Sequence, residues 1–582
     1  MAVTPPAPLK RAPYAPLKSR RGCKTCKARK VKCGEEKPHC LRCSSTGRKC
    51  EYAGTAYGTY SSAPAISSVI STANKTLSLL PNTVARERRA FAYYFQHAAP
   101  LVGGLDADFW SNIVPQVCVS EPAVWDAIIS ISTLFECHDQ PVVSGNYRDA
   151  LAWYSRAVSA VRVRLERGGM DVFVGLISCV LFICIEALQG GIEESLRLYA
   201  QGVHLILALR EQVVCGTLPS SDASLLEETI VPIFMRLGVI ASGGGVSIGK
   251  LLRDPGHHLV PGFVSLKAAR ESIIRLTAEV QIFQTECEEH HESSFALHPP
   301  QEILGKQAIL SASLAWWRKA FTNLMEQLPS KNTLTPDQIG TSALLLCYYE
   351  TLYVLVGICT SPIKSITDRY LAHFQQIVEQ SRIALLASAR ADGSQPPFTF
   401  DIGVAFPLLV VSLRCSDSRT RRNAIALMSK APQVQGFYGK PFAIAFSQKI
   451  MEIEESLALA LRGSSGVIES IMPATPASMD GLSHYSHSPG NHSDGSIDTT
   501  RTPNSHPDVS LMLTGADIPE EARIKPYGIF KPRDGIPPIT PVEEVMKWNV
   551  TPDQDLLQYS RTIGNPEART WHTLHECAPI YI

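Results

Sequence analysis

The chain has 582 residues, a formal net charge of +1 and a hydrophobic content of 45%, which is enough for a packed core and several domains. The opening sequence MAVTPPAPLKRAPYAPLK has no apolar segment of the kind that directs secretion. We therefore expect the sixteen cysteines to be in a reducing compartment, where a disulfide framework is excluded and clustered thiols act as metal ligands.

The near-neutral total hides an uneven charge distribution. Residues 1–50 contain fourteen Lys and Arg against two Glu, a formal charge of +12, so the remaining residues together carry −11. Such a basic segment is typical of a surface that binds a polyanion, and phosphate contacts should make that binding salt-dependent. Basic pairs within 10–21 also resemble a nuclear import signal, so we expect the protein in the nucleus.

Six cysteines lie within this basic segment in the pattern C-x2-C-x6-C-x6-C-x2-C-x6-C, which is one unit repeated twice. They are Cys23, Cys26, Cys33, Cys40, Cys43 and Cys50. A structural zinc ion takes four ligands, so six thiolates complete two zinc sites only if two of them bridge both metals. Because the segment has few apolar residues, the metal must supply much of its folding free energy.

This pattern resembles the zinc binuclear cluster (Zn2Cys6) DNA-binding domain of fungal transcription factors. The resemblance implies two Zn²⁺ per chain, with Cys23 and Cys40 as bridging ligands. One zinc would then also hold Cys26 and Cys33, and the other Cys43 and Cys50. A loop proline common in the family is matched by Pro38.

The resemblance also implies double-stranded DNA and the transcription machinery as partners. The family's recognition helix follows the second cysteine, which here is the stretch 27–32, and it enters the major groove. The family's base-reading positions fall on Arg29 and Lys30, and such side chains favour guanine in CGG-like sites. The expected DNA-contacting residues are Arg29, Lys30, Lys27, Lys32, Lys24 and Arg21.

The domain boundaries follow from composition. Residues 1–22 form a basic arm predicted to be disordered, and 23–52 form the zinc module. Residues 53–82 are rich in Ser, Ala, Gly and Thr, which indicates a flexible linker. This linker has no sustained heptads, so we do not expect a dimerising coiled coil there. A homodimer that forms through the larger domain remains an alternative.

Residues 83–462 have helical periodicity, so the predicted fold is mainly α, with a large all-helical domain behind the zinc module. The apolar runs 172–185 and 344–359 are read as buried helices, and no membrane partner is expected. Segments such as RERRAFAYYFQHAAPLVGGLDADFW and LISCVLFICIEALQGG resemble the fungus-specific regulatory domain of the same family. That resemblance implies a regulatory role, although Phe437-Tyr438 replaces a tryptophan frequent in relatives.

The last part of the chain divides in two. Residues 463–510 are poor in hydrophobic residues and rich in Ser, His, Pro and Gly, which indicates a disordered linker. Residues 511–582 form a C-terminal tail with acidic and apolar residues mixed in VEEVMKW and DQDLLQY. These two stretches suit either an activation segment or a helix that packs back on the main domain.

Two patterns argue for other functions. The stretch Gly245-Val246-Ser247-Ile248-Gly249 matches a hydrolase nucleophile elbow, but that motif needs a strand before it, and the preceding ETIVPIFMRLGVI is more typical of a helix. The cluster of Cys287 with His290 and His291 is read as a solvated loop. We therefore expect no enzyme, with a Ser247 hydrolase and a zinc-stabilised protein-interaction module that binds no DNA as the alternatives.

Overall fold

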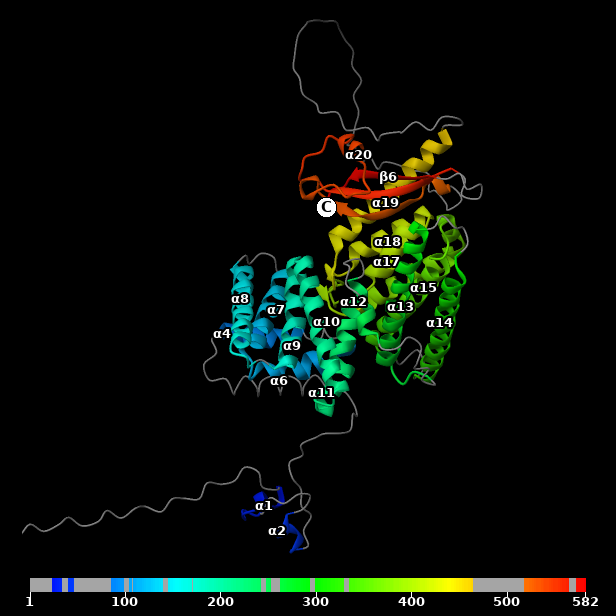
Figure 1. Ribbon diagram of the computed structural model, residues 1–582. Coiled ribbons are helices and arrows are strands. Elements are labelled where there is room, and N and C mark those ends of the chain that lie inside the picture. The colour runs from blue at the N-terminus through cyan, green and yellow to red at the C-terminus, as the bar shows by residue number, and fades with distance from the viewer. Residues whose placement is uncertain are drawn as a thin grey trace, which may run out of the picture. The chain divides into compact units, whose positions relative to one another are not determined.

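The structure is a computed structural model, and it divides into two compact units, 1–68 and 69–582, which are considered separately (Figure 1). The described residues are 24–33, 40–46, 85–98, 104–106, 108–139, 145–169, 171–241, 248–252, 262–293, 299–328, 334–463, 518–564 and 572–582. The predicted arm 1–22, linker 53–82 and segment 464–510 therefore lie outside the described residues.

In the first unit the structure describes two short helices. They are α1 (Lys24–Ala28) and α2 (Leu41–Ser44). The two helices contact each other, and the side chains between them are cysteines rather than ordinary apolar residues.

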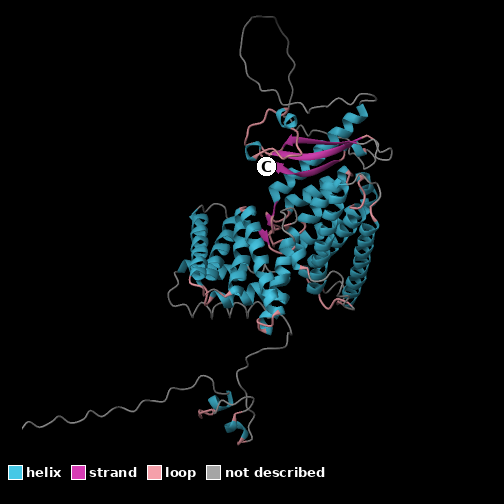
Figure 2. Ribbon diagram, in the orientation of Figure 1, coloured by secondary structure: helices cyan, strands magenta, loops and turns pink. Residues whose placement is uncertain are grey.

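The second unit is predominantly helical, as its sequence predicts (Figure 2). Its first helices are α4 (Ala85–Tyr93), η1 (Tyr94–Ala98), η2 (Gly104–Asp106), η3 (Phe109–Ile113), α6 (Val114–Cys118), α7 (Pro122–Asp139), α8 (Gly145–Glu166), α9 (Val172–Gln189), α10 (Ile192–Val214), α11 (Ser220–Leu225), η4 (Leu226–Ile230), α12 (Val231–Ile240) and η5 (Ile248–Leu251). Within this half α7 packs against both α8 and α9, and α9 packs against α10.

The helices that follow are longer. They are α13 (Leu266–Ser293), α14 (Gln301–Gln327), α15 (Pro336–Ile358), η7 (Lys364–Tyr370), α16 (Leu371–Ser388), α17 (Ala405–Arg414), α18 (Ser418–Lys430) and α19 (Lys440–Gly463). A small sheet of β1 (Phe398–Thr399), β2 (Val434–Gln435) and β3 (Tyr438–Gly439) lies among them, with β1 parallel and β3 antiparallel to β2. The helix α15 packs against α13, α14 and α16, so it lies at the centre of this half.

Local sequence signals fix several helix ends. The Asp171 side chain accepts a hydrogen bond of 2.7 Å from the Phe173 amide at the start of α9, and Gly190 ends that helix in the left-handed conformation. At the start of α15, Thr335 and Gln338 form a reciprocal capping box with Pro336 between them.

The apolar helices α9 and α15 are core elements. Both are long and apolar enough to cross a membrane by length and composition. However, 67% of the apolar window in α9 and 56% of that in α15 are buried inside the unit, and both helices contribute to its main hydrophobic core. This burial agrees with their interpretation as buried helices.

Four charged side chains, three buried and one partly buried, link distant parts of the chain within this helical region. Arg270 on α13 donates from Nη2 to Asp106 Oδ1 at 2.8 Å and from Nη1 to Asp401 Oδ2 at 2.5 Å. Arg236 on α12 pairs with Asp106, and its Nε lies 3.6 Å from Asp401 Oδ1. We call these four residues the Asp–Arg tetrad. Both arginines are at most 3% exposed.

The C-terminal residues form a second sheet, which was not foreseen from the sequence. Its strands are β4 (Ile524–Phe530), β5 (Leu556–Ile563) and β6 (His572–Pro579), all antiparallel, with β5 in the middle. Short helices η9 (Glu520–Ala522), η10 (Pro532–Asp534) and α20 (Val542–Met546) accompany it. Of the two tail stretches, VEEVMKW contains α20, which packs back on β6, whereas DQDLLQY leads into strand β5 and is not helical.

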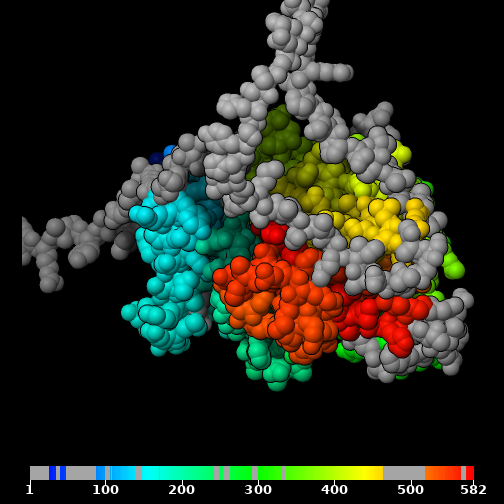
Figure 3. All heavy atoms as spheres, turned by 90° about the horizontal axis from the view of Figure 1, so that it is seen from above, coloured from blue at the N-terminus to red at the C-terminus, as the bar shows by residue number. Residues whose placement is uncertain are grey.

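The sheet packs on the helical region through α19 (Figure 1). Leu557 and Tyr559 of β5 form a buried cluster with Ile450 of α19, while Leu556 on the other face meets Val545 of α20. Both faces of β5 are therefore covered, and its residues lack the alternation of a strand with one face in water. In the space-filling view, the orange and red C-terminal segment lies beside the yellow atoms of the last helices (Figure 3).

Polar contacts reinforce this packing. Both oxygens of the Glu520 carboxylate accept hydrogen bonds of 2.8 Å from the backbone amides of Lys364 and Ser365 at the start of η7. Arg523 donates to Asp368 at 2.8 Å. These contacts, together with the 2.9 Å bond from the Ile524 amide to Glu454, are called the C-terminal latch below.

Candidate metal centre and nucleic-acid interface

The two helices of the first unit are placed alike with respect to the repeated cysteines. Helix α1 begins directly after Cys23 and contains Cys26, while α2 begins directly after Cys40 and contains Cys43. The sequence repeat is therefore also a repeat of local structure. Among the described residues, Cys26 of α1 directs its thiol toward those of Cys40 and Cys43 at α2.

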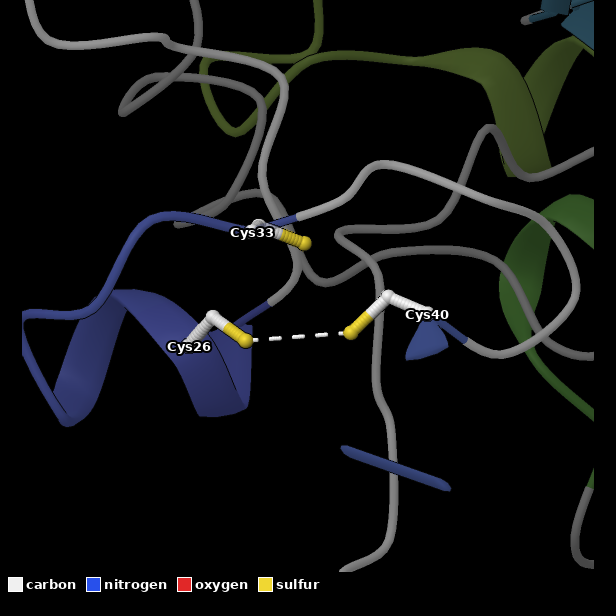
Figure 4. A group of neighbouring side chains, drawn as sticks. All are labelled: Cys26, Cys33 and Cys40. Atoms are coloured by element: carbon white, nitrogen blue, oxygen red, sulfur yellow. Dashed lines mark hydrogen bonds between the residues drawn. The ribbon is translucent and has the colours of Figure 1, made fainter. Parts of the chain in front are cut away.

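The described thiols converge on one place. The Sγ atoms of Cys26 and Cys40 are 3.7 Å apart, and those of Cys26 and Cys43 are 3.8 Å apart. The ligand atoms of Cys26, Cys33 and Cys40 all lie within 4.8 Å of one another (Figure 4). Four sulfurs about 2.3 Å from a tetrahedral zinc lie roughly 3.8 Å apart, so this spacing fits zinc ligands.

The thiols are buried, and neighbouring groups favour the thiolate form of Cys40. Cys26, Cys40 and Cys43 are fully buried, with Val31 and Cys33 packed against them, and the described residues of this unit hold no larger core. Although burial opposes the charged form, the Cys43 amide and the neighbouring thiols of Cys43, Cys33 and Cys26 hold the pKa of Cys40 below its ordinary value.

Helix α1 ends differently from the sequence-based expectation. The resemblance placed a helix over 27–32, whereas the observed helix stops at Ala28. The Val31 amide bonds to the Cys26 carbonyl at 3.1 Å and the Lys30 amide to the Lys27 carbonyl at 3.1 Å, which is a Schellman motif. Lys30 occupies the left-handed position of this turn with φ of 53°, a conformation that usually favours glycine. The expected helix position was therefore wrong by several residues.

The basic residues that follow Cys26 differ in their exposure and contacts. Lys27, Lys30 and Lys32 are exposed, whereas Arg29 is partly buried and its Nη1 donates to Thr46 Oγ1 at 3.4 Å. Thr46 occupies the same position after its C-x2-C pair as Arg29 does after the first pair, and our sequence analysis did not single it out. Alignment of the two halves of the repeat would have marked Thr46 as the counterpart of Arg29.

Other predicted site residues are only partly visible. Lys24 is the first residue of α1, and its side chain lies outside the described part of the structure. Cys23, Cys50 and Arg21 also lie outside the described residues. Within the residues that the structure describes, Cys26, Cys33 and Cys40 are the one group of three or more His, Cys, Asp or Glu side chains with ligand spacing.

The patterns that suggested other functions have ordinary structural explanations. Cys287, His290 and His291 were read as a solvated loop, but they lie on the last turns of α13, and Cys287 is 1% exposed. The segment before the G-x-S-x-G stretch is helix α12, as the sequence predicts, so the strand of a nucleophile elbow is missing there. Ser247 itself lies outside the described residues.

Residues 21–56 match the fungal Zn(2)-Cys(6) binuclear cluster domain. Together with the thiol geometry, this match identifies residues 21–56 as a fungal zinc binuclear cluster domain, and such a domain implies zinc binding.

A curated relative supports the same class. The chain is 27% identical over 220 residues to the "Aspercryptin biosynthesis cluster-specific transcription regulator atnN" of Emericella nidulans. The similarity covers 33% of this chain, which spans about a third (35%) of the length of the relative. No solved structure matches the chain.

Proposed function

We propose that this protein is a nuclear, sequence-specific DNA-binding regulator of transcription by RNA polymerase II. The observation that carries the proposal is the convergence of buried thiols in a segment whose Lys27, Lys30 and Lys32 are exposed. The thiols hold zinc and fold the module, and the lysines meet the phosphates and bases of duplex DNA. The printed name of the E. nidulans relative favours genes of a biosynthetic cluster as targets.

We propose two zinc ions per chain, with Cys23 and Cys40 bridging them. The close group of Cys26, Cys33 and Cys40 supports a first zinc held by these three thiolates together with Cys23. Cys43 and Cys50 would complete the second zinc. Six thiolates and two Zn²⁺ leave a charge of about −2, so the basic segment stays strongly positive and suited to DNA.

Base reading is proposed for the turn that follows α1. Lys30 is exposed there, and its ammonium group can reach guanine O6 and N7 in a CGG-like site. Arg29 would read an adjacent base after its guanidinium group leaves Thr46, which it contacts at 3.4 Å, and binds DNA instead. Lys24, Lys27, Lys32 and Arg21 would contact phosphates and thereby fix the register on the duplex.

The Lys30→Gly variant tests base reading. Glycine adopts the left-handed conformation of residue 30 without steric cost, so the turn is kept and only the side chain is lost. We expect specific binding to weaken by roughly 1–3 kcal/mol and the preference for CGG to relax, with zinc content unchanged. Gel shifts with a CGG-containing probe and a scrambled probe measure both effects.

The matched comparison is Lys32→Gly, which removes a second exposed cation. This variant should weaken binding to both probes alike, because a phosphate contact carries no sequence information. An equal loss on both probes for Lys30→Gly would show that Lys30 contacts phosphate only. If the unmodified protein has no measurable affinity for duplex DNA at physiological salt, the zinc module is a protein-interaction module instead.

A further inference from the structure

A cavity of about 650 Å³ lies between the C-terminal sheet and the helical region of the second unit. One wall comes from the last turns of α13, the end of α15 with the following segment, η7 and the end of α17. The opposite wall comes from β4, β5 and β6. The volume lies in the range of small-molecule sites, and such sites are frequent where two parts of a fold meet.

The cavity has an apolar body. Its apolar lining includes Ile358, Ile363, Ile366, Leu413, Tyr527 and Ile539. Tyr527 lies at a β-bulge that interrupts the pairing of β4 with β5 between Pro526 and Gly528. Walls of this kind bind the hydrocarbon part of an organic molecule.

Cations are the main charged groups of the lining. Lys364 begins η7, Arg414 ends α17 and Lys525 lies on β4, so three different elements each contribute one. Arg523 also reaches the cavity, but Asp368 holds its guanidinium at 2.8 Å. A positive group is thus presented to the cavity from both of its walls.

The lining has two acidic residues against four basic ones. The Glu454 carboxylate lies 2.5 Å from Arg421 Nη1 and also accepts the Ile524 amide, so it is occupied within the C-terminal latch. Glu288 is solvent-exposed on α13. The lining therefore has an excess of formal positive charge.

Burial has a clear effect on Lys364. Burial lowers the pKa of Lys364 to about 8; the carboxylates of Glu520 and Glu454 oppose this shift, and the cations Arg414 and Lys525 add to it. An anion in the cavity would favour the charged amine and relieve the repulsion among the three cations.

From the cavity and its lining, we infer that it is a binding site for a small organic anion with an apolar body, such as a carboxylic acid. The acidic group meets Arg414 and Lys364, and the hydrocarbon part lies against the isoleucines and Tyr527. Because the two walls belong to the helical region and to the sheet, bound ligand stabilises the docking of one on the other. This inference concerns the second unit and does not depend on DNA binding by the first.

Two fluorescent probes test the inference on the full chain. Anilinonaphthalene sulfonate has an apolar ring system with an anionic group, and phenylnaphthylamine is nearly the same molecule without the charge. We expect saturable binding of the anionic probe at one site per chain and at least tenfold weaker binding of the neutral probe. Arg414→Gln should weaken the anionic probe about tenfold, since it removes a charged hydrogen-bond donor.

The matched control is Arg419→Gln, which removes an exposed arginine of α18 that does not line the cavity and should leave binding unchanged. Lys525→Gln, from the sheet wall, provides a second variant should Arg414→Gln fail to fold by circular dichroism. Equal affinity for the two probes, several equivalent sites per chain, or unchanged affinity in both cavity variants would overturn the inference.

Discussion

Cys26→Ala is expected to abolish zinc binding by the first unit and, with it, binding to DNA. Cys26 is fully buried, and its Sγ lies 3.7 Å from that of Cys40 and 3.8 Å from that of Cys43. Structural zinc contributes about 10–16 kcal/mol in small zinc modules, which far exceeds what Val31 and the remaining thiols can supply. Loss of one ligand should therefore leave residues 24–46 unfolded.

Metal analysis of the purified full chain measures this effect directly. We expect two zinc ions per chain in the unmodified protein and fewer than one in Cys26→Ala. Cys215→Ala is the matched control, because Cys215 is an exposed cysteine of the second unit and its loss should change neither zinc content nor gel shifts. A single zinc in the unmodified protein would contradict the bridged cluster, and full zinc retention in Cys26→Ala would contradict its role as a ligand.

Asp106→Ala is expected to destabilise the helical region by roughly 3–5 kcal/mol. Asp106 contacts both buried arginines of the Asp–Arg tetrad, so its removal leaves Arg236 and Arg270 to share Asp401. Removing one partner of a buried ion pair leaves a charge without compensation, which costs far more than the loss of a surface pair. Urea unfolding followed by circular dichroism measures the change in midpoint.

Arg382→Gln provides the comparison, since Arg382 forms an exposed pair with Glu379 on α16 and its loss should cost less than about 1 kcal/mol. Lowering the pH should destabilise the helical region in the same way as Asp106→Ala. Burial disfavours the Asp106 carboxylate, but Arg236 and Arg270 hold its pKa below the ordinary 3.8. Its contribution is therefore complete above that value and is lost as the pH falls toward the lower folded pKa. Equal midpoints for the two variants would contradict this account.

The metal centre could be predicted from sequence because its signal is local. Six cysteines in a duplicated spacing require neighbouring ligands whatever the rest of the chain does, and Cys26, Cys33 and Cys40 indeed converge. The helical character of the second unit could equally be predicted from its hydrophobic periodicity. The left-handed conformation of Lys30 could not be predicted, because no apolar pattern marks a turn in which lysine takes the place usual for glycine.

The C-terminal sheet could not be predicted for a different reason. Strand β5 is buried on both faces, and it carries buried Gln558 and Ser560 whose polar groups find partners in Thr540 and Tyr527. Such a strand has neither the alternation of a half-buried strand nor the continuous apolar run of a core strand. The cavity beside the sheet could not be predicted either, because its lining residues lie between positions 284 and 575 and are far apart in the chain.

The C-terminal latch has a consequence for how the chain can vary. Glu520, Arg523 and Ile524 attach the sheet to the helical region by contacts that do not involve residues 464–517. A covalent connection also raises the effective concentration of the sheet, and this effect changes slowly with the length of the connection. We therefore expect the latch, with Asp368 and Glu454 as its receptors, to tolerate changes in the number of residues between 463 and 518.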